Sequence, residues 1–306
     1  MATFLVTQAT GSQGRETVAH LLEAGVKVHA LVRDAHKIPP ILKSPGVTLF
    51  QGESKNLDDV LQAAQGCKGA YLNTFPYPGL EILQAQTIIE ACKKAGVERI
   101  VACTTVGVGN RPAWDTSATA ALHLIDYFSS KAEVEAAVRA AGFASYTILR
   151  PAILLQDLLL PGVHQNYPRL HTHGELDHAF DDGVRAAQTD AFDVGRYAAA
   201  ALLDPAKFNG QEIELVSEAL TAEEMRDVIV RVSGRDVGLK KRSPEEVEEA
   251  KRTVFGQSFQ LLTNTIDIWS KETAREVEAK YGIPLTSVEA GLQREKARLL
   301  ECLPAA

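Results

Sequence analysis

The stretch Thr3-Phe4-Leu5-Val6-Thr7-Gln8-Ala9-Thr10-Gly11-Ser12-Gln13-Gly14 holds the first strand, loop and helix start of the chain. Where a strand leads through a Gly-rich loop into a helix, backbone N–H groups and the helix dipole point at one spot. The spacing follows G-x-x-G-x-x-G, except that Gln8 stands where the first glycine would make the tight turn. We predict a dinucleotide-phosphate loop, and an ordinary strand-to-helix turn is the alternative. The candidate loop residues are Thr7, Ala9, Thr10, Gly11, Ser12, Gln13 and Gly14.

The second strand-like run, residues 26–32, ends in Arg33-Asp34. In a site that prefers NAD, an acidic residue here accepts hydrogen bonds from the ribose hydroxyls. The planar guanidinium of Arg33 suits a 2′-phosphate instead, and Lys37 adds positive charge close behind it. The pattern therefore favours NADP(H) over NAD(H), and a solvated arginine beside Asp34 is the alternative.

Composition narrows the class of protein. The 306 residues are 45% hydrophobic and 23% charged, which is typical of a globular protein with a substantial core. A net charge of −7 argues against sequence-independent nucleic-acid binding. The chain shows no membrane-length apolar run and no signal-peptide pattern, so we expect a cytoplasmic location. Neither the cysteines nor the histidines near 164–178 have metal-ligand spacing, so we expect no metal.

Strand and helix signals alternate through the first half. We expect strands at 47–51, 69–73, 99–104 and 145–150, and helices at 57–64, 80–95 and 120–141. This alternation predicts an α/β fold, a Rossmann-type doubly wound parallel sheet with helices on both faces. The sheet domain is expected over 1–155, with returning segments near 190–218, and a smaller, mainly helical substrate lobe over 156–306.

The second half carries weaker signals. Residues 161–190 are rich in Gly and Pro, which predicts loops. Capping patterns at Thr221-x-x-Glu224 and Ser243-Pro244-x-Glu246 mark two helix starts. The apolar residues Phe255, Phe259, Leu262, Ile266 and Trp269 recur at helical spacing, which predicts a stripe facing the core.

Tyr127 and Lys131 form a Y-x-x-x-K pair inside an expected helix. Residues four apart lie on one helix face, and a neighbouring ammonium favours the phenolate, so Lys131 should lower the Tyr127 pKa. Such a tyrosine can exchange a proton with a carbonyl or alcohol oxygen. Thr104 and Thr105 are the nearest hydroxyls for polarising a substrate oxygen, although a threonine on a strand is often structural.

The chain resembles the NmrA-like members of the atypical short-chain dehydrogenase/reductase group over most of its length. The resemblance rests on the loop around Gly11 and Gly14 and on motifs in a matching order along the chain. These are Leu31-Val32-Arg33-Asp34, Gln51-Gly52-Glu53, Lys131 with Glu133-Val134-Glu135, Leu149-Arg150-Pro151-Ala152-Ile153-Leu154, Asp193-Val194-Gly195 and Ile283-Pro284-Leu285-Thr286-Ser287-Val288-Glu289.

The resemblance implies a role for each matching residue. Gly11, Gly14 and the backbone from Thr10 to Gln13 would hold the pyrophosphate, and Arg33 the 2′-phosphate. Lys131 would bind the nicotinamide ribose. Gly52 and Glu53 would lie near the adenine, Asn73, Thr74 and Phe75 beside the cofactor ribose, and Pro151 and Ile153 against the nicotinamide.

Two functions fit this pattern. The first is an NADP(H)-dependent oxidoreductase that transfers hydride to or from a carbonyl-type or conjugated small molecule, with Tyr127 as proton donor or acceptor. The second is an NADP(H)-sensing regulator with little turnover that acts through a protein partner. Tyr127 favours the enzyme, because many NmrA-like proteins lack this tyrosine, whereas Gln8 is a change seen among regulators of the family. A homo-oligomer is compatible with both.

Overall fold

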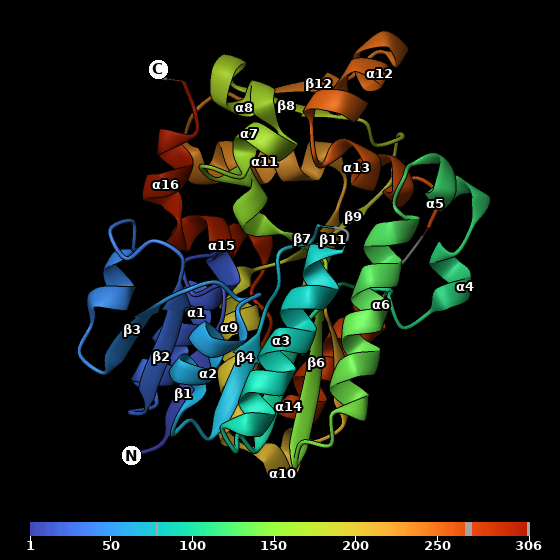
Figure 1. Ribbon diagram of the computed structural model, residues 1–306. Helices are drawn as coiled ribbons and strands as arrows, with labels where there is room; N and C mark the ends of the chain where they lie inside the picture. Colours follow the sequence, from blue (N-terminus) through green and yellow to red (C-terminus); the bar gives the residue numbers. More distant parts are fainter. Residues whose placement is uncertain (78, 267–270, 305–306) are drawn as a thin grey trace. The chain divides into compact units, whose positions relative to one another are not determined.

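The computed structural model describes residues 1–77, 79–266 and 271–304 (Figure 1). A seven-stranded sheet has the order β10-β6-β5-β4-β1-β2-β3, and the pairs from β1 to β6 are parallel. Its strands are β1 (Thr3–Val6), β2 (Lys27–Val32), β3 (Val47–Gln51), β4 (Gly69–Leu72), β5 (Arg99–Cys103), β6 (Ser145–Pro151) and β10 (Gln211–Leu215). The strand order reverses between β1 and β4, where doubly wound sheets bind ligands at the carboxyl ends of the strands. The predicted fold class is confirmed.

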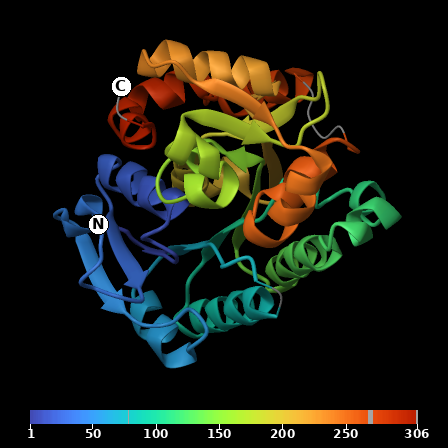
Figure 2. The same ribbon diagram turned by 90° about the horizontal axis from the view of Figure 1, so that it is seen from above.

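Helices cover both faces of this sheet. The helices of eight or more residues that the segments 1–109, 126–151 and 191–214 contribute are α1 (Ser12–Glu23), α2 (Leu57–Ala64), α3 (Leu80–Lys94), α6 (Ile125–Ala140) and α9 (Ala191–Leu203). Figures 1 and 2 show α3 and α6 side by side, with α9 on the opposite face of the sheet in Figure 1. The short helices η1 (Pro40–Lys43) and α10 (Pro205–Phe208) complete this set.

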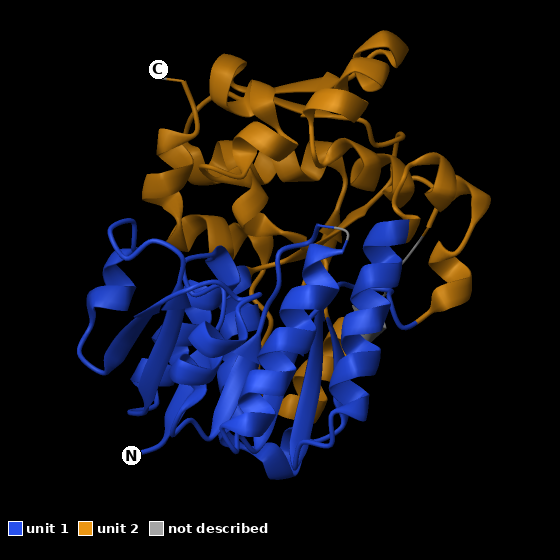
Figure 3. Cartoon of the chain, viewed as in Figure 1, with its two compact units in different colours: residues 1–109, 126–151, 191–214 blue, residues 110–125, 152–190, 215–306 orange. Residues whose placement is uncertain are grey.

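The chain divides into two compact units (Figure 3). The first unit holds the sheet and comprises residues 1–109, 126–151 and 191–214, and the second comprises 110–125, 152–190 and 215–306. The crossing of residues 110–125 into the second unit has no counterpart in the sequence pattern.

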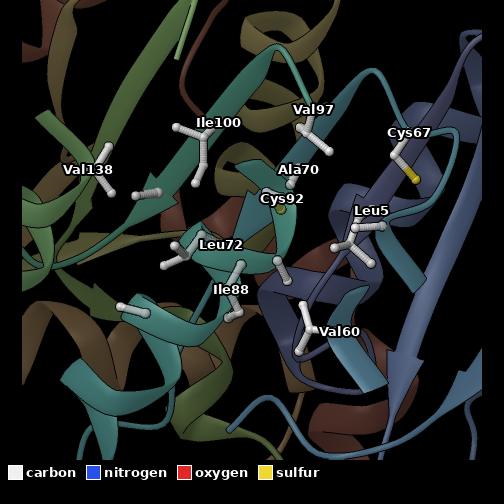
Figure 4. Packing of buried hydrophobic residues seen from close by; sticks show 14 of the residues in the cluster. Leu5, Val60, Cys67, Ala70, Leu72, Ile88, Cys92, Val97, Ile100 and Val138 are labelled. Carbon is white, nitrogen blue, oxygen red and sulfur yellow. The ribbon is translucent and has the colours of Figure 1, made fainter. Parts of the chain in front are cut away.

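One hydrophobic core lies between the sheet and the helices α2, α3 and α6 (Figure 4). Leu5, Leu72 and Ile100 come from three adjacent strands, and Ile88 and Val138 come from α3 and α6. All five are at most 1% exposed. Burial of such side chains stabilises the unit by about 1.5–3 kcal/mol each, and it also fixes where α3 and α6 meet the carboxyl edge of the sheet.

The opposite face depends on a close approach of α9 to α1. A Cβ on Gly195 would lie 2.4 Å from the carbonyl carbon of Glu16, a backbone atom of α1. Only glycine therefore allows this spacing between the two helices. Gly195 of the Asp193-Val194-Gly195 motif thus allows α9 to pack closely against α1, the helix that begins after the loop around Gly11.

The predicted helix over 120–141 is wrong at its start. The structure has a short helix α5 (Ser117–Ala121) and a separate α6 from Ile125 to Ala140. His123 lies between them with a φ of 57°, a left-handed conformation that interrupts a right-handed helix. Tyr127 consequently lies in the first turn of α6 rather than in its middle.

The second unit contains two small sheets and a core of its own. β11 (Glu218–Leu220), β9 (Ala186–Thr189) and β7 (Ile153–Leu154) form one sheet, and β12 (Gly238–Lys241) pairs with β8 (Glu175–His178). The helices are α4 (Arg111–Trp114), α5, η2 (Leu155–Leu158), α7 (Val163–Asn166), α8 (Pro168–His173), α11 (Ala222–Ser233), α12 (Pro244–Thr253), α13 (Gln257–Thr263), α14 (Lys271–Tyr281), α15 (Val288–Arg294) and α16 (Lys296–Glu301).

Three local predictions for this unit have different outcomes. Both capping boxes are present, at the starts of α11 and α12. Residues 161–190 contain α7, α8, β8 and β9, so the loop prediction there was wrong. The apolar stripe is helical only over Gln257–Thr263, Phe255 is 57% exposed, and Trp269 lies outside the described residues.

Candidate functional site

The glycine loop between β1 and α1 forms an exposed turn at the carboxyl edge of the sheet. Gly11 is the N-cap of α1, and no side chain caps the helix. Thr10 and Gly11 are exposed, whereas Ala9 and Gly14 are buried. An uncapped N-terminus of a twelve-residue helix presents backbone N–H groups and the positive end of its dipole to an anion.

Gln8 makes the turn that a glycine usually makes. Its φ is 51°, in the left-handed region that residues with a Cβ avoid, and its carbonyl accepts a hydrogen bond from Gly11 N at 3.0 Å. The same carbonyl lies 2.3 Å from where a Cβ on Gly14 would be. The loop therefore requires glycine at position 14, whereas at position 8 a residue with a Cβ adopts a strained left-handed conformation.

Thr7 and Gln13 tie this loop to the neighbouring strands. Thr7 is fully buried, and its hydroxyl oxygen accepts a hydrogen bond from Asn73 N at 3.0 Å. Gln13 Oε1 accepts hydrogen bonds from Tyr71 Oη and Cys103 Sγ, both at 2.9 Å. Burial raises the pKa of the Cys103 thiol to about 11, which keeps this donor protonated. The two side chains thus position the loop, whose backbone is left to face a ligand.

Arg33, Gly52 and Glu53 gather where β2 and β3 end. Gly52 N donates to Val32 O at 2.9 Å, and a Cβ on Gly52 would lie 2.5 Å from the Cβ of Asp59. Arg33 and Glu53 are exposed. Asp34 Oδ1 accepts from the backbone N of His36 at 2.9 Å, and no ion pair joins it to Arg33 in the part of the chain that is described. The guanidinium is therefore accessible to a ligand.

The loop after β4 carries Asn73, Thr74 and Phe75. Asn73 Oδ1 accepts from Thr74 N at 3.0 Å, and Phe75 N donates to Gln84 Oε1 at 2.9 Å. The Phe75 side chain is 53% exposed, whereas Thr74 is buried and donates its hydroxyl to Glu81 Oε1 at 2.7 Å. Of the three predicted residues, Phe75 offers its side chain to the solvent side of the edge.

Tyr127 and Lys131 come together on one face of α6, as the spacing predicts. Lys131 Nζ lies 5.7 Å from the centroid of the Tyr127 ring. Lys131 is 5% exposed, and its ammonium pairs with Glu81 Oε1 on α3 at 2.6 Å. Ser130 Oγ donates to the other oxygen of Glu81 at 2.7 Å. A buried carboxylate therefore holds the ammonium beside the phenol.

The Tyr127 pKa differs from the expectation. Burial raises the pKa of Tyr127, and the opposing effects of the Lys131 charge and a hydrogen bond with Thr105 do not reverse this. The expected lowering by Lys131 is present, but desolvation outweighs it. Burial by itself lowers the pKa of Lys131, yet the neighbouring Tyr127 and the carboxylate of Glu81 raise it overall. At neutral pH the phenol holds its proton and the ammonium holds its charge.

Thr104 and Thr105 differ in their surroundings. Thr104 is buried and donates its one hydroxyl proton to Glu135 Oε1 at 2.8 Å. Glu135 also accepts from Arg150 Nε at 2.8 Å and pairs with Arg139 at 2.6 Å. Thr105 is half-buried beside Tyr127. Of the two predicted hydroxyls, Thr105 is the one that stands next to the phenol.

Pro151 and Ile153 fall in different units. Pro151 ends β6 in the first unit, where its carbonyl accepts from Val106 N at 2.9 Å. Ile153 begins β7 in the second unit and lies in register with Gln188 of β9.

Glu81, Glu135 and Arg150 are the charged residues that sequence reasoning did not place in the site. Glu81 is only 1% exposed. An acidic residue in the first turn of a helix is expected to interact favourably with the helix dipole. The position of Glu81 in the sequence therefore does not indicate that it pairs with Lys131. Glu135 and Arg150 lie within motifs that carry the family resemblance. Nothing else in the sequence indicates that these two residues pair.

Two further properties concern the described residues alone. No group of three or more His, Cys, Asp or Glu side chains there is arranged to hold a metal ion. Among the helices described, none has the length and apolar character needed to cross a bilayer.

A sheet of this strand order, with a glycine loop at its switch point, defines a Rossmann-type α/β protein. The model of the NmrA-like family matches residues 1–261, and the chain belongs to that family. The family expectation is thereby confirmed.

Individual relatives include both enzymes and a regulator. An NAD(P)H azoreductase of Xenophilus azovorans is 27% identical over 255 residues, which are 83% of this chain and 81% of the azoreductase. Citrobacter sp. triphenylmethane reductase complexed with NADP(H) matches with a TM-score of 0.74 and 19% identity, covering 96% of this chain and 99% of that one. NmrA, a negative transcriptional regulator in complex with NADP, matches with a TM-score of 0.72 and 19% identity, covering 95% and 94%. At these identities the two structural likenesses show a shared fold.

Proposed function

We propose that this protein is an NADPH-dependent oxidoreductase that reduces a carbonyl-type or conjugated small molecule. The observation that carries the proposal is the placement of Lys131 Nζ 5.7 Å from the ring of Tyr127, in the unit that also holds the glycine loop. The azoreductase relative supports a redox role. A regulator would need the loop but would have no use for a proton donor.

The cofactor assignment rests on the loop and on Arg33. The uncapped start of α1 fits a pyrophosphate, and the exposed Arg33 fits the 2′-phosphate that distinguishes NADP from NAD. In this arrangement Gly52 and Glu53 lie near the adenine, and Asn73, Thr74 and Phe75 lie along the ribose. Pro151 and Ile153 are assigned to the nicotinamide. These roles are part of the proposal.

The proton chemistry is assigned to α6. The bound nicotinamide supplies the hydride. Tyr127 gives its phenolic proton to the substrate oxygen as the neighbouring carbon gains hydride, so one O–H bond breaks and another forms. Lys131 stabilises the resulting phenolate, which regains its proton from water. Thr105 is the hydroxyl positioned to polarise the substrate oxygen. A tyrosine that keeps its proton at neutral pH suits a donor, which is why we assign the reductive direction.

Tyr127→Phe tests the chemistry. We expect at least a 100-fold loss of NADPH oxidation with an aromatic ketone, a quinone or an azo dye as acceptor, with NADPH affinity unchanged by calorimetry. Tyr146→Phe on β6 is the matched control and should keep full activity. Unchanged turnover of Tyr127→Phe would remove Tyr127 from the mechanism.

Arg33→Ala tests the cofactor. NADPH binding should weaken by 10-fold or more while NADH binding changes little, because only NADPH carries the phosphate. Lys27→Ala, at the exposed start of the same strand, is the control for general loss of positive charge. Equal weakening for both nucleotides would refute the phosphate assignment.

The second candidate is an NADP(H)-sensing regulator that acts through a protein partner. The NmrA regulator shares the fold, and Gln8 replaces the first glycine of the loop here. Signalling would require NADPH to favour one of two conformations. Limited proteolysis with saturating NADPH, compared with none, would reveal such a change. Identical digestion rates, together with turnover, would exclude this alternative.

A further inference from the structure

Glu81 is the buried centre of a polar cluster between α3 and α6. It is 1% exposed, and its two oxygens accept three hydrogen bonds. Thr74 Oγ1 and Lys131 Nζ donate to Oε1 at 2.7 and 2.6 Å, and Ser130 Oγ donates to Oε2 at 2.7 Å. A buried carboxylate is tolerated only when it is paired and hydrogen-bonded in this way.

The cluster fixes the ammonium of Lys131 in one place. A lysine side chain has several rotatable bonds, and a charge-assisted bond of 2.6 Å to a buried partner removes most of that freedom. An ammonium has three N–H donors, and the bond to Glu81 uses one of them. The remaining donors can serve a ligand while the nitrogen stays beside the Tyr127 ring.

Glu81 also acts on Tyr127 through its charge. The titratable groups that act on the phenol are Lys131 on the same helix, Glu81 on α3 and Cys103 on β5, together with the hydroxyl of Thr105. Lys131 favours the phenolate, and Glu81 opposes it. Glu81 therefore offsets part of the effect of Lys131, and burial of the phenol favours its protonated form.

We propose that Glu81 is a positioning residue of the proton-transfer site: it holds Lys131 beside Tyr127 and offsets its charge, so that Tyr127 stays a proton donor into the alkaline range. This inference rests on the proposed reductase function, because it gives a role to the same phenol. It adds a residue on α3 that a Y-x-x-x-K motif does not contain.

Glu81→Gln removes the charge and keeps the shape. Without Glu81 the ammonium acts on Tyr127 unopposed, and the phenolate itself supports the charge on Lys131. The tyrosinate absorbance of Tyr127 should then appear at least about one pH unit lower than in the unchanged protein, a tenfold rise in the ionised fraction. The signal of Tyr127 is isolated from the seven tyrosines by subtracting the Tyr127→Phe counterpart of each protein.

Enzyme kinetics give a second readout. The alkaline limb of kcat for NADPH-dependent reduction should move down by the same amount, since the donor loses its proton earlier. Glu81→Asp keeps the charge but shortens the side chain, so its titration should match the unchanged protein while KM for NADPH rises. Glu90→Gln, an exposed ion-pair partner of Lys94 on the same helix, should change neither quantity.

The outcomes separate this inference from the proposed function. A Glu81→Gln protein that is folded by circular dichroism but titrates like the unchanged protein would overturn the role of Glu81, even if Tyr127→Phe is inactive. A Glu81→Asp protein that shifts as far as Glu81→Gln would also overturn it, because charge would not be the cause. The absorbance titration needs no turnover, so it tests Glu81 even if no acceptor is reduced.

Discussion

Gly195→Ala should destabilise the protein although alanine is the better helix former. The added Cβ would lie 2.4 Å from the carbonyl carbon of Glu16 and 2.6 Å from the backbone N of Thr17. Ordinary contacts begin near 3.4 Å, so α9 and α1 must separate by about 1 Å, the difference between 3.4 and 2.4. Backbone atoms cannot turn aside as a side chain can.

The net magnitude follows from two opposed terms. Overpacking of a close interface costs about 1–3 kcal/mol or somewhat more. Replacement of glycine by alanine within a helix returns about 1 kcal/mol. We therefore expect the free energy of unfolding to fall by up to about 2 kcal/mol, and NADPH to bind more weakly because α1 carries the glycine loop.

Urea denaturation followed by circular dichroism measures the first effect, and calorimetry with NADPH measures the second. Ala200→Gly on the same helix supplies the helix-propensity term, which should be a loss of about 1 kcal/mol. If Gly195→Ala were instead stabilised by the amount that Ala200→Gly loses, the close contact between α1 and α9 would be refuted.

Three further predictions concern single residues. Gln8→Gly should stabilise the protein by about 0.5–1 kcal/mol in urea denaturation, because relief of the left-handed strain exceeds the added chain entropy; a loss of stability would contradict the strained turn. Arg150→Met should cost about 3–5 kcal/mol by leaving Glu135 without its buried partner, and adding Glu135→Leu should restore most of it; no recovery in the double variant would contradict the pairing. Burial raises the pKa of Asp157 from 3.8 to about 7. The contribution of Asp157 to the free energy of unfolding is therefore fully present below pH 3.8 and is lost as pH rises through 7. Asp157→Asn should therefore be neutral near pH 4 and, after a discount for partial exposure, more stable by about 2 kcal/mol at pH 8, and equal effects at both pH values would exclude this titration.

The sequence of this chain predicts well those features that depend on residues close together along the chain. The apolar run before Gly11 and the helix after it predict a strand, a turn and a helix start, and all three are present. Alternating short strands and helices are sufficient to predict the sheet. The capping boxes at Thr221 and Ser243 are likewise set by residues three apart. Each of these depends on backbone geometry within a few residues.

Other features depend on partners that are distant in the chain. Tyr127 and Lys131 are four residues apart and their pairing is predictable, but Glu81, which pairs with the Lys131 ammonium, lies 50 residues before Lys131. The break at His123 likewise has no local pattern that distinguishes it from a continuous helix. The direction of the Tyr127 pKa shift does not follow from the Y-x-x-x-K motif for the same reason, because desolvation depends on everything that covers a group.

The sequence by itself thus determined the Rossmann-type sheet, the glycine loop at its switch point and the alignment of Tyr127 with Lys131. Only the tertiary structure decided that Gln8 adopts a left-handed turn, that Gly195 lets α9 pack closely against α1, and that Glu81 pairs with Lys131. The physical reason is the separation along the chain over which each interaction acts. Periodicity and capping act over three or four residues, whereas burial and ion pairing act between elements that only folding brings together.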